Sequence, residues 1–481
     1  MIFRRRSKLA YTPPVRTLVG GTNRCWYRSI DDIVTSLDMR KWIQKLASDQ
    51  NARAMPRIFL PAFLVTGAVL FLVVPKLESL SAYKYGLQFA DGYDLIASNL
   101  ANGSGYRWNV DMGETMMREP GYPLFLAAVF KVAGHHIEAA RSANWLLTIG
   151  IVAMIVRLTR FITDDRNTAT IAGLLFLFHP GTLIAEARGG VEILFIFAAF
   201  LFMVALHEAV EKGKLWRYSV AGLGLGAVVQ VRSTPIVFPA LLLFYLVFRV
   251  YGMREWRRAV LNTAIVGLGM VLVMTPWMIR NYLLVHEFVP VATLQGVALQ
   301  EGQYTCRKLS PGTDFYVLGR EAGRERGDLA SRLGLRFEGA EYFQFFYDPH
   351  DEWAFNNLLL QEAKDEYINH PGLLAECVGK NLFNFWFLGK TWQITGLNML
   401  IQAPLLGLAV GGFYLLWRRD ALRRIGLILT FVVSIVAVHL PIVAEARYSI
   451  PVFAFLAIPA AVSIKAIRQK YARRVEERVM A

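Results

Sequence analysis

Charged and polar side chains stand at the ends of long apolar segments, at points far apart in the sequence. Arginine presents a planar fork of donors that suits a phosphate group, and a carboxylate can accept a proton from an incoming hydroxyl as a general base. Together the two residue types could bind an anionic substrate and transfer a group from it. The set is Asp91, Asp94, Arg118, Glu119, His179, Glu186, Arg188, Glu192, Arg232, Arg280, Glu445 and Arg447.

The segments that must position these residues are apolar enough to cross a membrane. The chain has 481 residues, of which 55% are hydrophobic and 13% aromatic, more than a soluble domain of ordinary composition carries. Runs of roughly 17 to 25 residues can cross the bilayer core, and about ten occur here. They predict an all-α polytopic membrane protein with spans at 58–75, 142–160, 168–187, 190–208, 217–232, 235–250, 259–279, 393–417, 424–441 and 448–465.

The basic residues predict the orientation of these spans. The formal net charge is +15, but the bases do not gather into a patch that would fit a nucleic-acid groove, so no nucleic-acid partner is expected. They lie instead at alternate ends of the spans, as Arg254, Arg257 and Arg258 do. The positive-inside bias places these ends in the cytoplasm, and an even number of spans then puts both termini inside.

This topology divides the chain. Two segments are long and lie outside, and a short apolar stretch in the first of them, 122–134, is predicted to form a helix in the interface because it is only half a crossing long. Two amphipathic helices are expected on either side of His370-Pro371. The expected parts are a basic cytosolic extension (1–56, with a short amphipathic helix around 30–47), an N-terminal transmembrane module (57–279) whose first outer loop (76–141) is catalytic, an outer segment (280–392), C-terminal transmembrane helices (393–466) and a basic cytosolic tail (467–481).

The charged residues at the outer ends predict an outward-facing polar cavity. A charge near the bilayer centre costs roughly 2.5–3.5 kcal/mol unless it meets water or a partner. Structural interpretations stay open for some of them: Arg280 could snorkel to the interface. Arg188 could pair with Glu186 or Glu192, and Arg447 with Glu445.

Two apolar patterns predict packing rather than chemistry. Gly222 and Gly226 are spaced for a close helix contact of the small-xxx-small type. The stripe GVEILFIFAAFLF (190–202) is expected to face lipid.

Three cysteines are too few for a disulfide framework. Cys306 and Cys377 both fall in the outer segment, whereas Cys25 falls in the cytosolic extension. A single bridge between Cys306 and Cys377 in an oxidising compartment and two free thiols are both open.

Several motifs resemble one family when they are taken in order. The first outer loop contains DGYDLIASNLANGSGY (91–106) and then EPGYPLF (119–125), in which Glu119 stands where the family more often has a second proline. HPGTLIAEARGGVEILFIF, AGLGLGAVVQVRSTPIVFP, TPWMIRNY and EARYSIPVFAFLAIPA follow. From about residue 58 to 465 the chain resembles the GT-C glycosyltransferases, in particular the polytopic family of protein O-mannosyltransferases, lipid A aminoarabinose transferases and bacterial core galacturonosyltransferases.

The resemblance implies a GT-C fold and an inverting sugar transfer from a polyprenyl-phosphate donor to an acceptor hydroxyl at the outer membrane face. The essential acid of the family falls on Asp91, the expected catalytic base, with Asp94 as the rival acid. The donor phosphate is expected to bind Arg447, Arg280 and Arg232. Weaker substrate-binding candidates are Asp94, Arg118, Glu119, Tyr122, Glu186, Arg188, Glu192 and Glu445.

The cofactor and the acceptor stay open. Some GT-C enzymes use a divalent cation such as Mg²⁺ or Mn²⁺ and others do not, and no ligand spacing here marks a dedicated site. The expected partners are the lipid-linked donor, membrane lipids and a lipid or glycan acceptor, with a protein acceptor also open. The expected location is a bacterial inner membrane, with the active site facing the periplasm.

Two alternative functions use the same residues. A flippase or transporter of a lipid-linked sugar would need polar residues at mid-membrane and repeat symmetry, of which the sequence shows little. A glycan ligase or polymerase would differ in taking a glycan chain as the donor.

Overall fold

The computed structural model describes residues 54–78, 91–310, 312–339, 341–418 and 421–480. The helix predicted around 30–47 lies outside the described residues. The chain divides into two units after Pro61. Helix α3 (Ala54–Ala68) begins in the first unit and continues into the second, where η1 (Val69–Val73) and α4 (Val74–Glu78) follow it.

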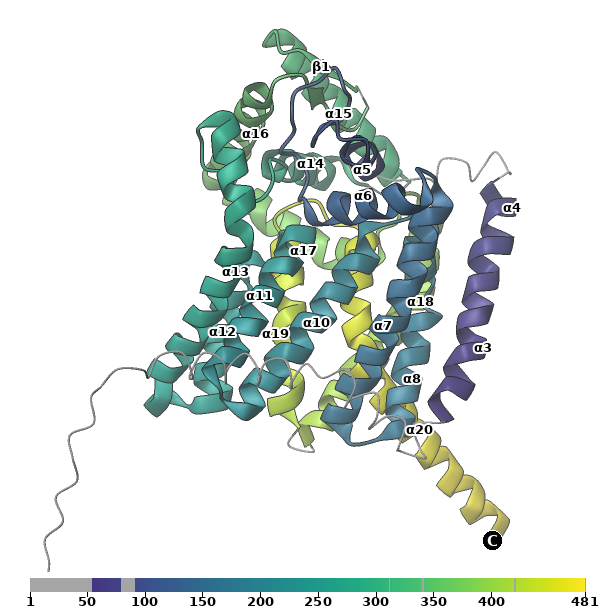
Figure 1. The fold of residues 1–481 in the computed structure, drawn as a ribbon. Coiled ribbons are helices and arrows are strands. Elements are labelled where there is room, and N and C mark those ends of the chain that lie inside the picture. The colour runs from purple at the N-terminus through teal and green to yellow at the C-terminus, as the bar shows by residue number, and fades with distance from the viewer. Residues whose placement is uncertain (1–53, 79–90, 311, 340, 419–420, 481) are drawn as a thin grey trace, which may run out of the picture. The chain divides into compact units, whose positions relative to one another are not determined.

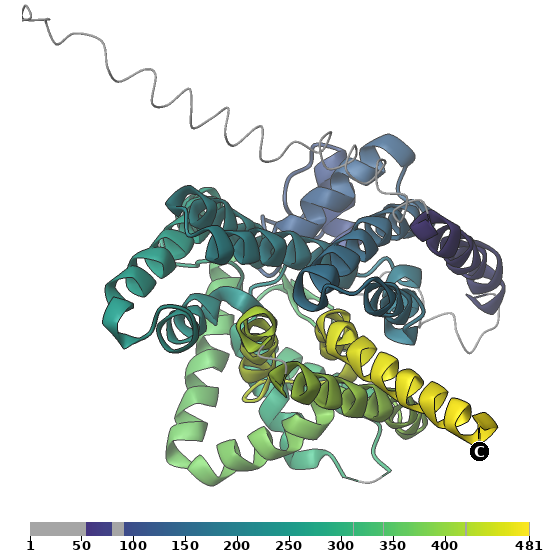
Figure 2. The ribbon, with the colours of Figure 1, turned by 90° about the horizontal axis from the view of Figure 1, so that it is seen from below.

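Long helices form a bundle within Ala62–Ala481 (Figure 1). Viewed from below, the C-terminal end of the yellow helix α20 runs beyond its neighbours (Figure 2). The bundle contains α7 (Ile137–Thr163), α8 (Arg166–Leu177), α9 (Pro180–Ala187), α10 (Val191–Lys212), α11 (Leu215–Val231), η2 (Thr234–Val237), α12 (Phe238–Tyr245), η3 (Leu246–Tyr251), η4 (Met253–Glu255), α13 (Trp256–Val285), α18 (Trp392–Arg418), α19 (Leu422–His439), η5 (Ala446–Ser449) and α20 (Ile450–Met480).

The chain is polytopic, as predicted. In the described residues seven helices are long and apolar enough to cross a membrane, or eight if the bent pair Arg166–Leu177 and Pro180–Ala187 is one span. The predicted number of about ten is not confirmed. The predicted span 217–232 forms α11, which has 17 residues, and the apolar helix Arg424–His439 in the predicted span 424–441 is also short.

The remaining helices lie beyond one end of the bundle (Figure 1). The first outer loop supplies α5 (Tyr93–Ala101) and α6 (Gly121–Ala133), and α6 is the short helix predicted for 122–134. The outer segment supplies the two helices predicted around His370-Pro371. Its elements are α14 (Gln295–Lys308), α15 (Phe315–Arg332), the antiparallel strands β1 (Phe337–Glu338) and β2 (Phe345–Phe346), α16 (Pro349–Asn369) and α17 (Pro371–Phe387).

Helix α10 is part of the core. Ile193, Phe195 and Phe200 are at most 1% exposed, and the helix packs against α7, α11 and α20. The prediction that the stripe 190–202 faces lipid was therefore wrong. A helix that is apolar on all sides suits either lipid or a protein core, and the stripe alone does not separate the two.

The close contact predicted at Gly222 joins α11 to α13. A Cβ atom at Gly222 would lie 2.5 Å from the carbonyl oxygen of Val266. We expect Gly222→Ala to lower the stability by about 1–3 kcal/mol, because overpacking outweighs the gain in helix propensity. Thermal unfolding in detergent measures this. Gly267→Ala, on α13 with open space around its Cβ position, is the control; equal melting of the two variants would contradict the packing.

Candidate active site

Asp91 lies in the first outer loop, at the start of the described stretch 91–310, and forms an unusual turn with Gly92. Its φ is 70° and that of Gly92 is 69°. Side chains rarely tolerate this left-handed region, although aspartate does so better than most. A Cβ at Gly92 would also lie 2.6 Å from the ring of Trp108. The Asp-Gly pair therefore makes the turn and leaves Asp91 outside the helix that carries Asp94.

Arg447 joins Asp91 to a second carboxylate. The Arg447 Nη2 atom lies 2.5 Å from Oδ2 of Asp91, and its Nε atom lies 2.6 Å from Oε1 of Glu192. Arg232 Nη1 lies 3.8 Å from the same Glu192 oxygen. We call these four residues the charge network. The Glu192 side chain is only 2% exposed, so its arginine partners offset the cost of burying its charge.

Helix ends place the members of the charge network. Glu192 lies in the first turn of α10, where the helix dipole favours an acid. Arg232 is the C-cap of α11, and Arg447 lies in the short turn η5 ahead of α20. Three segments far apart in the sequence thus converge on the turn that carries Asp91.

The ionisation of Asp91 follows from this geometry. Burial has the largest influence and raises the pKa of its carboxyl, but Arg447, with Arg118 and Arg188, more than offsets burial and holds the pKa below its usual range. Asp91 is therefore a carboxylate at neutral pH. It is a weak base for as long as Arg447 stays bound to it.

Arg118 lies near the charge network as a buried cation. It is 4% exposed, and its Nε and Nη2 atoms have no hydrogen-bond partner among the described residues. Its guanidinium lies over the rings of Tyr93 and Phe343, at 5.2 and 4.6 Å from their centroids. Burying donors without acceptors is costly, and guanidinium N–H groups suit an anionic partner.

Three further charged residues lie near the charge network: Arg188, Glu445 and Lys390. Burial has the largest influence on Glu445 and raises its pKa, although Arg447, Arg188 and Lys390 act in the opposite direction. The Nε atom of Arg188 has no hydrogen-bond partner in the part of the chain that the structure describes. Lys390 is absent from the predicted site residues. The sequence could have indicated it, because Lys390 is a lone lysine at the expected outer end of a span, where basic residues are rare.

Arg280 and Asp94 form other contacts. Arg280 Nη2 lies 2.9 Å from Oε2 of Glu114, and its Nη1 donates to the Thr115 carbonyl at 2.8 Å. The guanidinium also lies over the ring of Trp277. Asp94 Oδ2 lies 3.7 Å from Nε2 of His135. The structure therefore does not bring Arg280 or Asp94 into the charge network.

Glu119 and Tyr122 tie the first outer loop to the bundle. Glu119 Oε1 accepts hydrogen bonds from the backbone N–H and the hydroxyl of Ser233, at 3.0 and 2.7 Å. The Tyr122 hydroxyl donates to the Gly189 carbonyl.

Glu186 and His179 have partners inside the bundle. Glu186 accepts a hydrogen bond from Thr148 on α7 rather than pairing with Arg188. His179 Nδ1 accepts from the Gly181 N–H and so caps α9, which begins at Pro180.

The Arg280 contacts make a prediction. Arg280→Gln is expected to lower the melting temperature, because it removes the ion pair with Glu114. Donor binding should weaken less than in Arg447→Gln, because the Arg280 guanidinium pairs with Glu114, outside the charge network. Binding of a polyprenyl-phosphate lipid by both variants tests this, and equal losses of affinity would return Arg280 to the phosphate site.

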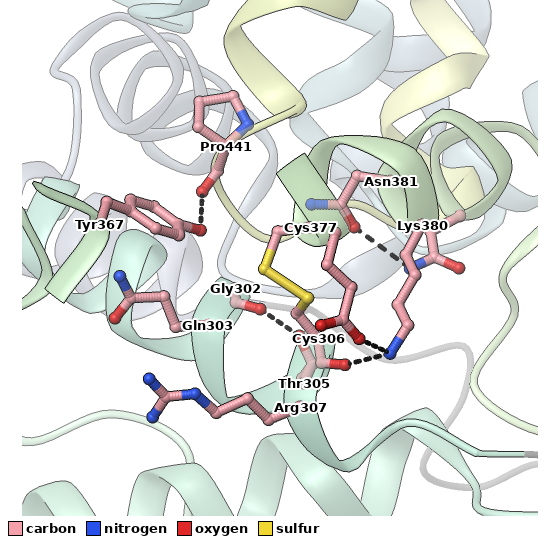
Figure 3. Close-up of a disulfide and its surroundings, with 12 residues drawn as sticks. Gly302, Gln303, Thr305, Cys306, Arg307, Tyr367, Cys377, Lys380, Asn381 and Pro441 are labelled. Carbon is pink, nitrogen blue, oxygen red and sulfur yellow. Dashed lines mark hydrogen bonds and ion pairs between the residues drawn. A yellow bond between two sulfur atoms is a disulfide. The ribbon is translucent and has the colours of Figure 1, made fainter. Parts of the chain in front are cut away.

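Cys306 of α14 and Cys377 of α17 form a disulfide, with their Cα atoms 5.4 Å apart (Figure 3). Of the two alternatives that the sequence leaves open, the structure has the bridge.

The carboxylates near Asp91 do not gather into a metal site. The described residues hold no group of three or more His, Cys, Asp or Glu side chains that could bind a metal ion. Asp91 and Glu192 are instead paired with Arg447.

Comparison with known proteins identifies solved structures with a similar fold. The fold is similar to that of the archaeal oligosaccharyltransferase AglB from Archaeoglobus fulgidus, solved with an inhibitory peptide and a dolichol-phosphate. The TM-score is 0.53 and the identity 13%, over 90% of this chain and 53% of that chain. The A. fulgidus oligosaccharyltransferase solved with Zn and sulfate gives a TM-score of 0.51 and 14% identity, over 88% of this chain and 50% of that one. The chain spans about half the length of these proteins.

The fold is similar to that of these oligosaccharyltransferases, and the resemblance of the sequence motifs implied a fold of this kind. Residues 118–279 match the family model described as dolichyl-phosphate-mannose-protein mannosyltransferase. ArnT from Cupriavidus metallidurans, bound to undecaprenyl phosphate, is a weaker match, with a TM-score of 0.36 and 13% identity over 84% of this chain and 77% of that chain. No curated protein sequence matches the chain.

Proposed function

We propose that the protein is a membrane glycosyltransferase that moves a sugar from a polyprenyl-phosphate donor to an acceptor hydroxyl at the outer membrane face. The observation that carries the proposal is the ion pair between Asp91 and Arg447 within the charge network. It combines a cation that suits the donor phosphate with a carboxylate that suits the acceptor hydroxyl.

Arg447 and Arg232 bind the donor phosphate in this proposal. Preorganised donors stabilise the charge that develops on the leaving phosphate. Arg118 adds buried N–H groups that lack acceptors among the described residues. Because Arg447 holds Asp91, phosphate oxygens compete with the carboxylate for the same guanidinium. Donor binding therefore raises the pKa of Asp91 and frees it for the acceptor.

The chemical step is a displacement with inversion. The acceptor oxygen forms a bond to the anomeric carbon while the bond from that carbon to the phosphate oxygen breaks. The hydroxyl proton passes to Asp91, and the electron pair of the broken bond stays on the polyprenyl phosphate. The products are an inverted glycoside and the free lipid phosphate.

The remaining assignments are part of the same proposal. Glu445 lies close enough to Arg188 and Lys390 for their charges to offset part of the rise that burial causes in the pKa of its carboxyl. It is a candidate for hydrogen bonding to the sugar. A lipid or glycan is the favoured acceptor, and the site faces the periplasm from a bacterial inner membrane. The alternative role for Asp91 is to bind a metal ion rather than to act as a base.

A panel of donors tests the proposal. Purified protein in proteoliposomes is given polyprenyl-phosphate sugars that differ in the sugar, together with a lipid extract as the acceptor. We expect at least one donor to yield a glycosylated acceptor and free lipid phosphate. Release of neither product from any donor in the panel would contradict the proposal.

A further inference from the structure

The corner between α19 and η5 leads directly to Glu445 and Arg447. Helix α19 ends at His439, and the last carbonyl groups of a helix have no partners within it. Here side chains of the outer segment supply partners just beyond the helix end. Asn381 Nδ2 donates to the carbonyls of Leu440 and Ile442, at 2.9 and 2.7 Å.

A second side chain binds the carbonyl that lies between those two. The Tyr367 hydroxyl donates to the Pro441 carbonyl at 2.8 Å (Figure 3). Three successive carbonyls of the corner are thus held by α16 and α17. Asn381 and Tyr367 are 4% and 8% exposed, so both donor side chains are buried, and leaving one of them unpaired would be costly.

The backbone of the corner is also bound to the outer segment. The Val443 N–H donates to the Ala298 carbonyl at 3.2 Å, and the Ala446 N–H to the Leu388 carbonyl at 2.9 Å. A Cβ at Gly302 of α14 would lie 2.6 Å from the carbonyl carbon of Ile442. The corner is therefore packed tightly against α14 and bonded to the residue that follows α17.

The disulfide links α14 and α17, two of the three helices that contact the corner. Cys306 lies on α14 and Cys377 on α17, and Lys380 Nζ donates to the Cys306 carbonyl at 2.7 Å (Figure 3). Both cysteines are at most 2% exposed. A reductant reaches this bond only after local opening, so the bridge acts as a fixed link rather than a switch.

We propose that Asn381, Tyr367 and the disulfide form a clamp that positions Arg447 for the transfer reaction. The inference rests on the proposed function. Arg447 follows Ala446, whose N–H donates to the carbonyl of Leu388, the residue directly after α17. The Nη2 and Nε atoms of Arg447 must meet Asp91 and Glu192 together. Because a shift of about 1 Å in a catalytic group can cost a hundredfold in rate, an anchored corner is needed. Asn381 and Tyr367 are positioning residues that act through Arg447.

Asn381→Asp tests the clamp with little change in shape. The variant keeps the oxygen that accepts from Asn384 but removes the donors to Leu440 and Ile442. We expect donor binding about tenfold weaker, from the loss of two partly buried hydrogen bonds, and faster hydrogen exchange at the amides of Val443 and Ala446. Asn369→Asp, at an exposed position of α16, is the matched control and should behave like wild type.

Two further variants test the clamp in case Asn381→Asp does not fold. One removes a single hydroxyl, and the other removes the disulfide. Tyr367→Phe removes one hydroxyl and should speed exchange at the same amides. The pair Cys306→Ser with Cys377→Ser should do so as well, whereas Cys25→Ser should not. Wild-type exchange and donor affinity in both Asn381→Asp and the double serine variant would overturn the clamp. Failure of the wild-type protein to transfer any sugar would instead overturn the proposed function, since exchange is measured without substrate.

Discussion

Asp91→Asn is expected to lower the rate of sugar transfer by about 10²- to 10⁴-fold, the range that a general base contributes. The amide keeps the shape of the carboxylate but cannot accept the hydroxyl proton. Donor binding should persist or tighten, because the Nη2 of Arg447 no longer meets a competing carboxylate. Transfer under single-turnover conditions and binding of the donor lipid measure the two effects separately.

Asp94→Asn is the matched control for this result. It changes the same residue type three positions later, on a side chain that faces His135, and should leave transfer close to wild type. Full transfer by Asp91→Asn, or an equal loss in Asp94→Asn, would contradict the assignment of the base. A metal-ligand role for Asp91 would show as a rate that falls on chelation and returns with Mg²⁺ or Mn²⁺.

The pKa of Asp91 also predicts a pH dependence. Because Arg447 holds this pKa below its usual range, the ion pair contributes stability above the unfolded-state pKa of about 3.9. That contribution is lost as the pH falls through the lower folded-state value. Protonation of Asp91 in the free enzyme therefore does not lower kcat/KM between about pH 5 and 8. A loss in this range that vanishes in Asp91→Asn would contradict the depressed pKa.

Arg447→Gln is expected to have the second large effect, because one guanidinium serves two carboxylates. The variant should lose donor binding as well as transfer, unlike Asp91→Asn. It should also be less stable, since removing one partner of a buried pair costs roughly 3–5 kcal/mol. That figure is an upper bound here, because Asp91 is 24% exposed and Arg232 remains near Glu192. Donor binding and thermal unfolding provide the measurements.

A compensating substitution separates the two losses in Arg447→Gln. A double variant that adds Asp91→Asn to Arg447→Gln removes the carboxylate that has lost its ion pair, while Glu192 keeps Arg232 nearby. It should recover much of the melting temperature without recovering transfer. Arg473→Gln, in the exposed C-terminal part of α20, is the control. Wild-type donor affinity in Arg447→Gln would exclude this arginine from the phosphate site.

Much of the fold could be predicted from the sequence, because membrane spans leave a strong signal in apolar composition. The limits are physical. Helix α11 has 17 residues, at the lower limit for a membrane span, although it packs against α10 and α13. The apolar stripe of α10 is the same whether lipid or protein surrounds it.

The candidate site was only partly predictable. Motifs and topology place Asp91, Glu192, Arg232 and Arg447 in one layer, and the structure joins them. The same reasoning could not rank Arg118 above Arg280, because the rank depends on which guanidinium already has partners. Nor could it find Asn381, because the two carbonyls to which its side chain donates are about sixty residues away in the sequence.

The fate of a doubly labelled donor tests the central claim most directly. A polyprenyl-phosphate sugar labelled in both the sugar and the lipid is placed in proteoliposomes with the acceptor, and both labels are followed by mass spectrometry. The account predicts that sugar enters the acceptor while an equal amount of free polyprenyl phosphate forms, and that both processes slow by about 10²- to 10⁴-fold with Asp91→Asn. A donor that crosses the bilayer intact, with both labels still joined, would contradict it and identify a transporter.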